Sequence, residues 1–318
     1  MSSAVIGRFA PTPSGFLHLG NVFCSLLAWL FAKSQGGKIV LRIEDLDPAR
    51  CSVEKADRLA KDLAWLGLNW DEGAYVSKNH EDYFQSNRFS IYQKYFAQLE
   101  ANENIYSCFC SRNELHAANA PHLSDGRFIY AGTCRNLSLA ERQEKMQMRK
   151  PSYRLKVKDE DISFVDGIYG RMTYNLANES GDFIVRRSDG VYAYQLAVVI
   201  DDALMHVNQV VRGSDLLSST AMQLYLYDLL ELKVPSFTHI PLLVAPDGRR
   251  LAKRDEDMEL DVLRKKLQAP EKIIGWLAFL AGQIHKYEPL KAEDLLHIFD
   301  PKKIPQANII VPQELLNL

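Results

Sequence analysis

The chain has 318 residues, 47% of them apolar and 25% charged, with a formal net charge of −2. These values are typical of a globular protein with a sizeable core, and they argue against a protein dedicated to coating nucleic acid. No apolar run approaches the ~18 residues of a membrane helix, and no signal peptide is apparent, so we expect a cytoplasmic protein that does not enter a membrane.

The first predicted elements surround a tight loop. An apolar run at residues 4–6 predicts a brief buried strand, and a longer one at residues 22–31 predicts a buried helix. A helix N-terminus suits phosphate, because its N–H groups are unpaired. His18 could add a donor there, and Gly20 would let a flat ligand lie against the backbone. The alternative is an ordinary strand-to-helix turn with an incidental histidine.

A second predicted strand, at residues 38–43, runs directly into three acids, Glu44, Asp45 and Asp47. The carboxyl ends of parallel strands form the edge at which open α/β folds bind ligands, so Glu44 is a candidate site residue. A solvated loop with a helix cap is the alternative. Apolar spacings of three and four residues predict two amphipathic helices after it, one ending at Gly67 and one over residues 89–99.

Three of the five cysteines are clustered, at Cys108, Cys110 and Cys134. Thiolates are preferred ligands of zinc, and a structural zinc site takes four protein ligands. The fourth would be a histidine, a tyrosine or an acid. Three buried free thiols are the alternative. The nearby candidates for the fourth ligand are His116, His122 and Tyr130.

Strand patterns dominate from Pro151 onward. The short apolar run at residues 183–185 predicts a strand, and a hairpin-type turn follows at residues 188–190. The apolar run that ends at Asp201-Asp202 again places acids at the exit of a buried element. Arg212 follows a predicted strand, where it could hold a carboxylate with two hydrogen bonds, or simply pair with a structural acid.

A predicted helix at residues 219–232 and a strand at residues 240–244 lead into a basic loop. Four of the six residues from Arg249 to Arg254 are basic, which suits a polyphosphate ligand, although such a run can also be a solvated face. The segment from Glu256 to the C-terminus is predicted to be largely helical.

Taken together, these segments resemble the class I aminoacyl-tRNA synthetases of the glutamyl type. HLGN at residues 18–21 and RLAKR at residues 250–254 resemble the two class signatures, with Lys253 as the final lysine. Ala252 and Arg250 depart from the second signature, where serine and lysine are usual. Four further motifs resemble the glutamyl branch in particular, and they occupy residues 8–15, 42–50, 194–202 and 211–216.

The resemblance implies an α/β fold with a Rossmann-type parallel sheet, a zinc-containing insertion and a short C-terminal helical region. A full glutamyl-tRNA synthetase would continue into a large anticodon-binding region, whereas this sequence has only residues 255–318 after the second signature. The chain is therefore most similar to the truncated branch of the family, the glutamyl-Q tRNA(Asp) synthetases. The expected division is a catalytic domain at 1–100 and 182–255, an insertion at 101–181 and a helical region at 256–318.

The resemblance also implies a ligase reaction. L-glutamate would be activated with ATP and magnesium to glutamyl-adenylate, and then transferred to queuosine in the anticodon of tRNA(Asp). Glutamate carries two carboxylates and one ammonium, which two arginines and one acid would complement. The implied glutamate residues are Arg8, Thr12, Glu44, Tyr194 and Arg212. The implied ATP residues are His18, Gly20, Asn21 and Lys253, with His18 and Lys253 also catalytic. The implied ligands of one structural zinc are Cys108, Cys110, Tyr130 and Cys134.

We expect a monomer. One rival hypothesis is a truncated glutamyl-tRNA synthetase that still charges a tRNA 3′ end. A second is a non-catalytic glutamate-binding paralogue, and a third is a nucleotidylyltransferase of the same superfold.

Overall fold

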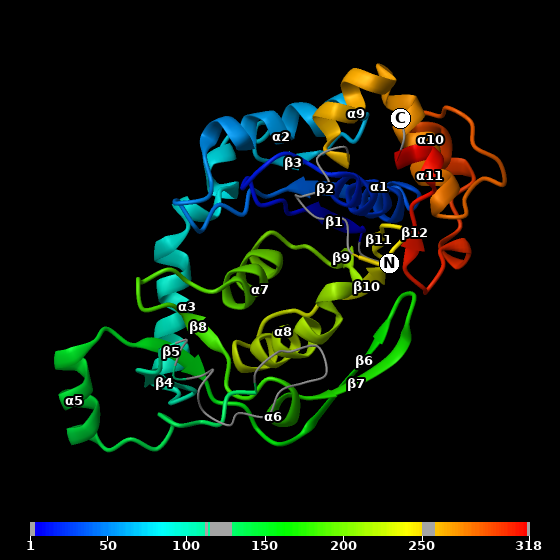
Figure 1. Ribbon diagram of the computed structural model, residues 1–318. Coiled ribbons are helices and arrows are strands. Elements are labelled where there is room, and N and C mark those ends of the chain that lie inside the picture. Colours follow the sequence, from blue (N-terminus) through cyan, green and yellow to red (C-terminus); the bar gives the residue numbers. More distant parts are fainter. Residues whose placement is uncertain (1–3, 112–113, 115–128, 250–257, 317–318) are drawn as a thin grey trace.

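The structure is a computed structural model that describes residues 4–111, 114, 129–249 and 258–316. Its centre consists of five short parallel strands (Figure 1), namely β1 (Ile6–Phe9), β2 (Lys38–Leu41), β3 (Glu72–Gly73), β9 (Gln209–Gly213) and β10 (Ser236–Ile240). Hydrogen bonds join β1, β2 and β3 in that order, and β9 pairs with β10. The N–H of Asn208 donates to the carbonyl of Ile6, so β9 lies beside β1.

Helices cover both faces of these strands, namely α1 (Leu19–Lys33) and α2 (Val53–Trp65) on one face and α3 (Phe89–Ala101), α7 (Tyr194–Leu204) and α8 (Leu217–Leu229) on the other. The strand period of two produces this division, because Ile39 and Leu41 belong to the first core and Val40 to the second. Ten of the fifteen residues of α1 are buried, which makes it a central helix. A parallel sheet between helical layers is the predicted α/β architecture.

The chain between α3 and α7 forms an antiparallel sheet and a long hairpin. The sheet has the order β4-β5-β8, from β4 (Ile105–Cys108), β5 (Ser152–Leu155) and β8 (Ile184–Arg186). The hairpin is β6 (Asp161–Asp166) and β7 (Gly170–Asn175), and the helices are α5 (Leu139–Met148) and α6 (Leu176–Glu179). Short 3-10 helices occupy His80–Tyr83, Gln85–Asn87 and Ser214–Leu216.

The tip of the β6–β7 hairpin reaches back to the parallel strands and lies against β10 (Figure 1). The N–H of Gly167 donates to the carbonyl of Phe237 over 3.0 Å. A Cβ atom on Gly167 would lie 2.3 Å from Oγ1 of Thr238, so only glycine permits this approach. The β6–β7 hairpin is therefore anchored directly on β10, the strand that carries His239.

The C-terminal region is less helical than predicted. Helices α9 (Leu260–Leu267) and α10 (Pro270–Leu280) are followed by 3-10 turns at Glu293–His297 and Pro301–Lys303, by strand β12 (Ile309–Ile310) and by α11 (Gln313–Leu316). Strand β12 pairs in parallel with β11 (Leu243–Val244). Helix α10 stops because Gly282 has a φ of +71°, and the prolines beyond it lack the N–H that a helix needs.

The predicted helices of the catalytic part are confirmed to within a few residues, whereas two other predictions need correction. The first strand is β1 at Ile6–Phe9 and not residues 4–6. The acids Asp201 and Asp202 do not follow a buried element but lie inside α7, where both are buried. Across the described residues, we find no helix of the length and apolarity that a bilayer crossing requires.

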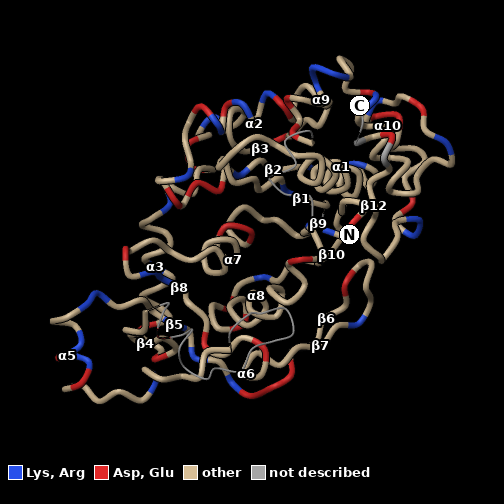
Figure 2. Tube along the Cα trace, in the orientation of Figure 1, with Lys and Arg blue, Asp and Glu red and all other residues tan. Residues whose placement is uncertain are grey.

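The basic residues of α9 lie near acids of α2 and of α9 itself (Figure 2). Arg264 lies 3.4 Å from Asp62, and Lys265 lies 2.9 Å from Asp261. The pairs are partly exposed, so their contribution to stability is small.

Candidate active site

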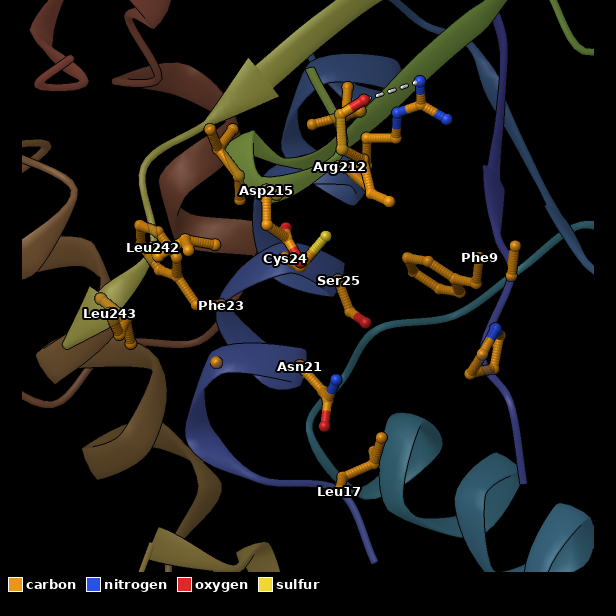
Figure 3. A pocket seen from close by; sticks show the side chains of 18 of the residues that line it. Phe9, Leu17, Asn21, Phe23, Cys24, Ser25, Arg212, Asp215, Leu242 and Leu243 are labelled. Atoms are coloured by element: carbon orange, nitrogen blue, oxygen red, sulfur yellow. Dashed lines mark hydrogen bonds between the residues drawn. The ribbon is translucent and has the colours of Figure 1, made fainter. Parts of the chain in front are cut away.

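A cavity of about 240 Å³ opens at the carboxyl ends of β1, β9 and β10, against the start of α1. Figure 3 shows Asn21, Cys24 and Ser25 projecting from α1 toward this space, with Phe9 across from them. Asn21 and Ser25 are four residues apart and so lie on one face of the helix. Of the residues predicted as site residues, the cavity lining contains Arg8, His18, Gly20, Asn21, Tyr194 and Arg212.

His18 is the N-cap of α1 and forms a capping box with Asn21. Its Nδ1 accepts from the backbone N–H of Asn21 over 3.4 Å, and the Asn21 side-chain oxygen accepts from the backbone N–H of His18 over 3.1 Å. Because Nδ1 is an acceptor, the neutral ring carries its proton on Nε2 and can donate it. Gly20 lies against this ring, since a Cβ there would be 3.1 Å from its atoms.

Arg212 lies at the end of β9, and its hydrogen-bond partners among the described residues are neutral groups. Its Nε donates to Nε2 of His239 over 3.0 Å. Its two terminal nitrogens donate to Gln223 over 2.7 Å and to Thr220 over 2.8 Å. Burial, foremost, lowers the pKa of Arg212 from its ordinary value. Among the described residues no carboxylate lies within the 4.0 Å of an ion pair to Arg212, so it is a buried cation without an acidic partner.

His239, which follows the buried strand residues Phe237 and Thr238, is fully buried and connects Arg212 to the insertion. Its Nδ1 lies 2.6 Å from the carboxylate of Asp166, and that carboxylate also accepts the His239 backbone N–H over 3.0 Å. Burial lowers the pKa of His239, with Arg212 acting in the same direction. The ring is therefore neutral, with a proton on Nδ1 toward Asp166 and a lone pair on Nε2 toward Arg212.

Arg42 is the centre of a second charged group and has no exposed surface. Its guanidinium lies 2.7 Å from Asp202, 3.1 Å from Glu44 and 3.8 Å from Asp201. Arg8 joins this group through Asp202, at 3.6 Å, and donates to the carbonyl of Val211 over 3.1 Å. Unlike Arg212, Arg42 has its charge fully compensated by protein carboxylates.

Helix α7 supplies two of the acids of this group, Asp201 and Asp202. Asp201 accepts hydrogen bonds from Arg88, Gln85 and Tyr92, over 2.7, 2.8 and 2.9 Å. The network thus fastens α7 to α3 and to the turn before it.

Of the remaining predicted glutamate residues, Tyr194 lines the cavity, whereas Glu44 and Thr12 do not. Glu44 is buried beside Arg42, and burial raises the pKa of Glu44 although Arg42 and Arg8 oppose this. Tyr194 is the first residue of α7, and burial raises the pKa of its hydroxyl. Thr12 is exposed, and neither it nor Glu44 belongs to the cavity lining. Lys253, the predicted catalytic lysine, lies outside the described residues.

The three clustered cysteines lie together in the insertion, where their sulfur atoms are all within 4.8 Å of one another and could hold a metal ion. Sγ of Cys110 is 3.6 Å from Sγ of Cys134. The hydroxyl of Tyr130 lies 3.4 Å from Sγ of Cys108 and 3.8 Å from that of Cys110. Two of the predicted alternatives for a fourth ligand, His116 and His122, lie outside the described residues.

Arg154, which sequence reasoning did not select, supports this cluster. Its guanidinium stacks on the ring of Tyr130 at 3.7 Å, and its Nε donates to Sγ of Cys108 over 3.2 Å. Burial acts to raise the pKa of Cys108, but hydrogen bonds from Tyr130 and the charge of Arg154 outweigh it and lower that pKa. Burial and the neighbouring Cys108 raise the pKa of Cys110 to about 12.

Sequence reasoning also missed Arg42, His239 and Asp166. Arg42 could have been found, because it stands two residues before Glu44 in a strand pattern and so shares its side of the sheet. For His239 there was no signal, since a lone histidine in an apolar strand indicates nothing about its partners. Asp166 reads as an ordinary turn residue beside Gly167.

A cavity at the carboxyl edge of parallel strands, bounded by a helix N-terminus, is the arrangement typical of α/β proteins of the Rossmann type. The family model for the catalytic domain of the class I tRNA synthetases for glutamate and glutamine (E and Q) matches residues 4–317. The chain belongs to this family and is a ligase, as the sequence motifs predicted, and the class I α/β fold is confirmed.

Proteins of other organisms are similar in sequence to this chain over most of its length. A glutamyl-Q tRNA(Asp) synthetase of Symbiobacterium thermophilum is 48% identical over 97% of this chain and 96% of its own length. One of Nitratidesulfovibrio vulgaris is 44% identical, with 98% and 97% covered. The glutamate–tRNA ligase 2 of Syntrophus aciditrophicus is 36% identical over 97% of this chain but only 64% of its own length. The crystal structure of a glutamate tRNA ligase from Elizabethkingia meningosepticum, in complex with its amino acid, has a TM-score of 0.84 at 28% identity, covering 99% of this chain and 68% of that one.

Proposed function

We propose that this protein activates L-glutamate with ATP and transfers it to queuosine in the anticodon of tRNA(Asp). The relatives that match over almost their full length carry the name of that activity. The observation that carries the activation step is Arg212, a buried cation at the cavity whose described neighbours include no acidic partner. A substrate carboxylate would supply the missing charge.

In the proposed glutamate pocket, Arg8 and Arg212 face the two carboxylates of the substrate. Glu44 and the hydroxyl of Tyr194 are assigned to its ammonium side, and Thr12 to the entrance. Arg42 lies between Glu44 and Asp202 and Arg8 also pairs with Asp202, whereas Arg212 has no acidic partner among the described residues, so the positive charge for the substrate is assigned to Arg212 with Arg8 beside it. Substrate binding would then complete a nearly neutral buried site, which favours glutamate over an amino acid with an uncharged side chain.

In the proposed activation step, a carboxylate oxygen of glutamate attacks the α-phosphorus of ATP. The bond from that phosphorus to the β-phosphate bridging oxygen breaks, and pyrophosphate leaves, with ATP bound as its magnesium complex. His18 would donate a hydrogen bond from Nε2–H to the phosphates. Gly20 and Asn21 form the helix start against which ATP would lie. Lys253 is assigned to the leaving pyrophosphate from its sequence position alone. Positioning and charge stabilisation supply the catalysis.

We also propose that the metal of the cysteine cluster is one structural zinc, bound by Cys108, Cys110, Cys134 and Tyr130. The donors fit this ion. A tetrahedron with Zn–S bonds of about 2.3 Å has edges of about 3.8 Å, near the 3.6 Å between two of the sulfurs. Four protein ligands leave no open position, so the site would hold the insertion together and take no part in the reaction. The proposed insertion spans residues 101–181, between catalytic segments 1–100 and 182–255, with 256–318 at the end.

Metal analysis tests this site. We expect about one zinc per chain, and Cys134→Ser should release it and lower the melting temperature, because metal binding is coupled to folding of the insertion. Cys51→Ser, at a cysteine outside the cluster, is the matched control and should keep the zinc. A folded, fully active protein without zinc would contradict the proposal.

The function itself is tested with labelled glutamate and two preparations of tRNA(Asp), one with and one without queuosine. We expect glutamate-dependent ATP–pyrophosphate exchange without any tRNA, and label only on the tRNA that contains queuosine. Label on tRNA lacking queuosine would indicate charging of the 3′ end instead. Absence of exchange with intact, folded protein would indicate a glutamate-binding paralogue without activity.

A further inference from the structure

The donors of Arg212 are directed by a chain of three buried side chains that begins in the insertion. Asp166 stands at the end of β6, His239 in β10 and Arg212 in β9. The distances along the chain are 2.6 Å from Asp166 to Nδ1 of His239 and 3.0 Å from Nε2 of His239 to Nε of Arg212. His239 has no exposed surface, and it therefore exchanges no hydrogen bond with bulk water.

The chemistry of this chain fixes which atom carries each proton. A carboxylate only accepts, so Nδ1 of His239 must donate, and its Nε2 is left as an acceptor. An arginine only donates hydrogen bonds, so Arg212 needs an acceptor at that position, and the unprotonated Nε2 of His239 is one. The opposite tautomer would set N–H against N–H at 3.0 Å. Asp166 thus selects the one form of His239 that can hold Arg212.

Thr220 and Gln223 accept hydrogen bonds from the terminal nitrogens of Arg212, and Nε2 of His239 accepts one from its Nε. These neutral acceptors fix the plane of the guanidinium. A carboxylate at any of these positions would neutralise Arg212 and compete with the substrate. A neutral imidazole instead orients the cation and leaves its charge available. The negative charge of Asp166 polarises the His239 ring without contacting Arg212. The Asp166 carboxylate also accepts hydrogen bonds from the backbone N–H groups of Ile168 and Tyr169, at 3.0 Å each.

We propose that His239 is a positioning residue for glutamate, which holds Arg212 in the orientation that grips a substrate carboxylate, and that Asp166 in the β6–β7 hairpin sets its tautomer. This inference rests on the proposed function of Arg212. It assigns the hairpin a second role beyond architecture, since its tip is anchored beside the strand of His239 through Gly167 and Phe237.

The test compares two replacements of the same histidine. In His239→Gln, the amide oxygen can replace Nε2 as an acceptor for Arg212. In His239→Asn, the shorter amide reaches only the Asp166 side. We expect His239→Asn to raise KM for glutamate in ATP–pyrophosphate exchange by about 10- to 100-fold, the range for a hydrogen bond to a charged group. KM for ATP should change less than about twofold, and His239→Gln should restore most of the glutamate KM.

Asp166→Asn provides a second variant with an intact ring. Its amide can donate to Nδ1, which would turn Nε2–H toward Arg212, so we expect an increase in the glutamate KM similar to that of His239→Asn. The double variant Arg212→Gln/His239→Asn should have the same KM as Arg212→Gln alone, because His239 acts through Arg212. His297→Asn, at an exposed histidine, is the control and should leave all parameters unchanged.

The inference is overturned if His239→Asn and His239→Gln are equally impaired, if KM for ATP rises in parallel with that for glutamate, or if neither KM changes. Thermal melting of each variant separates these results from unfolding. Failure of the proposed function itself would look different, because the unaltered protein would then give no glutamate-dependent exchange.

Discussion

Replacing Arg212 by glutamine is expected to lower kcat/KM for glutamate in ATP–pyrophosphate exchange by about 1,000-fold, since losing one partner of a buried, hydrogen-bonded charge pair costs ~2–5 kcal/mol. Glutamine can still donate to the neutral acceptors around position 212 but carries no charge. The measurement is the glutamate dependence of exchange at saturating ATP. The affinity for ATP should be almost unchanged, because the charge is assigned to the amino acid.

The same variant should not destabilise the free protein. Arg212 is a buried cation with neutral partners, and burying such a charge opposes folding. The melting temperature of Arg212→Gln should therefore equal or exceed that of the original protein, which is the pattern of a residue retained for function. Arg171→Gln, at an exposed arginine, should change neither quantity. A decrease in kcat/KM below tenfold, or a large decrease in melting temperature, would contradict the assignment.

Local patterns predicted the parts of this site that lie next to each other in the sequence. The apolar run after His18 indicated a buried helix, and the loop before it indicated the helix start that forms one wall of the cavity. Arg8 was selected from the motifs of the family alone, and Arg212 both from those motifs and from its place after a predicted strand. Such motifs identify which residues are near the ligand, since parallel strands end at one common edge.

The partners of those residues were not predictable, because they depend on contacts between distant segments. Arg42 and Asp202 are separated by 160 positions, and Asp166 and His239 by 73. An alternating strand pattern gives the side of the sheet on which a residue lies but not the helix packed against it. Asp201 and Asp202 were placed at the end of an element for a different reason, because a short apolar run does not distinguish a strand from a helix.

The cysteine cluster was an intermediate case. The residue types predicted a metal site, and the structure brings the three sulfurs together. The role of Arg154 could not have been deduced, because its contact with Cys108 requires β5 to pair with β4 in a particular register. In each of these cases the sequence identifies candidate ligands, and tertiary structure determines how they are oriented and charged.

Arg42 is the counterpart of Arg212, and replacing it should affect stability first. We expect Arg42→Met to lower the free energy of unfolding by about 3–5 kcal/mol, the cost of leaving a buried charge without its partner. Three carboxylates, on Glu44, Asp201 and Asp202, lie within 4 Å of its guanidinium, and those of Glu44 and Asp202 would lose their nearest cation. Arg8 and Arg88 remain as partial substitutes. Urea denaturation at pH 8 measures the difference.

The pH dependence identifies the cause of this loss. Burial raises the pKa of Glu44 above its ordinary value and Arg42 opposes this shift, so removing Arg42 should raise the pKa of Glu44 further in the folded state. A carboxyl group with a raised pKa destabilises the fold when it is ionised, so the deficit should be largest at pH 8 and shrink as the pH falls toward 5.5 and Glu44 takes up a proton. Arg50→Met is the matched control, because Arg50 lies 3.1 Å from Asp47 but is 70% exposed, and its loss should cost less than about 1 kcal/mol. A deficit that is the same at both pH values would indicate lost packing. A stability deficit that shrinks at the lower pH would show that Arg42 neutralises the fixed acids of the site, which leaves Arg212 available for the substrate.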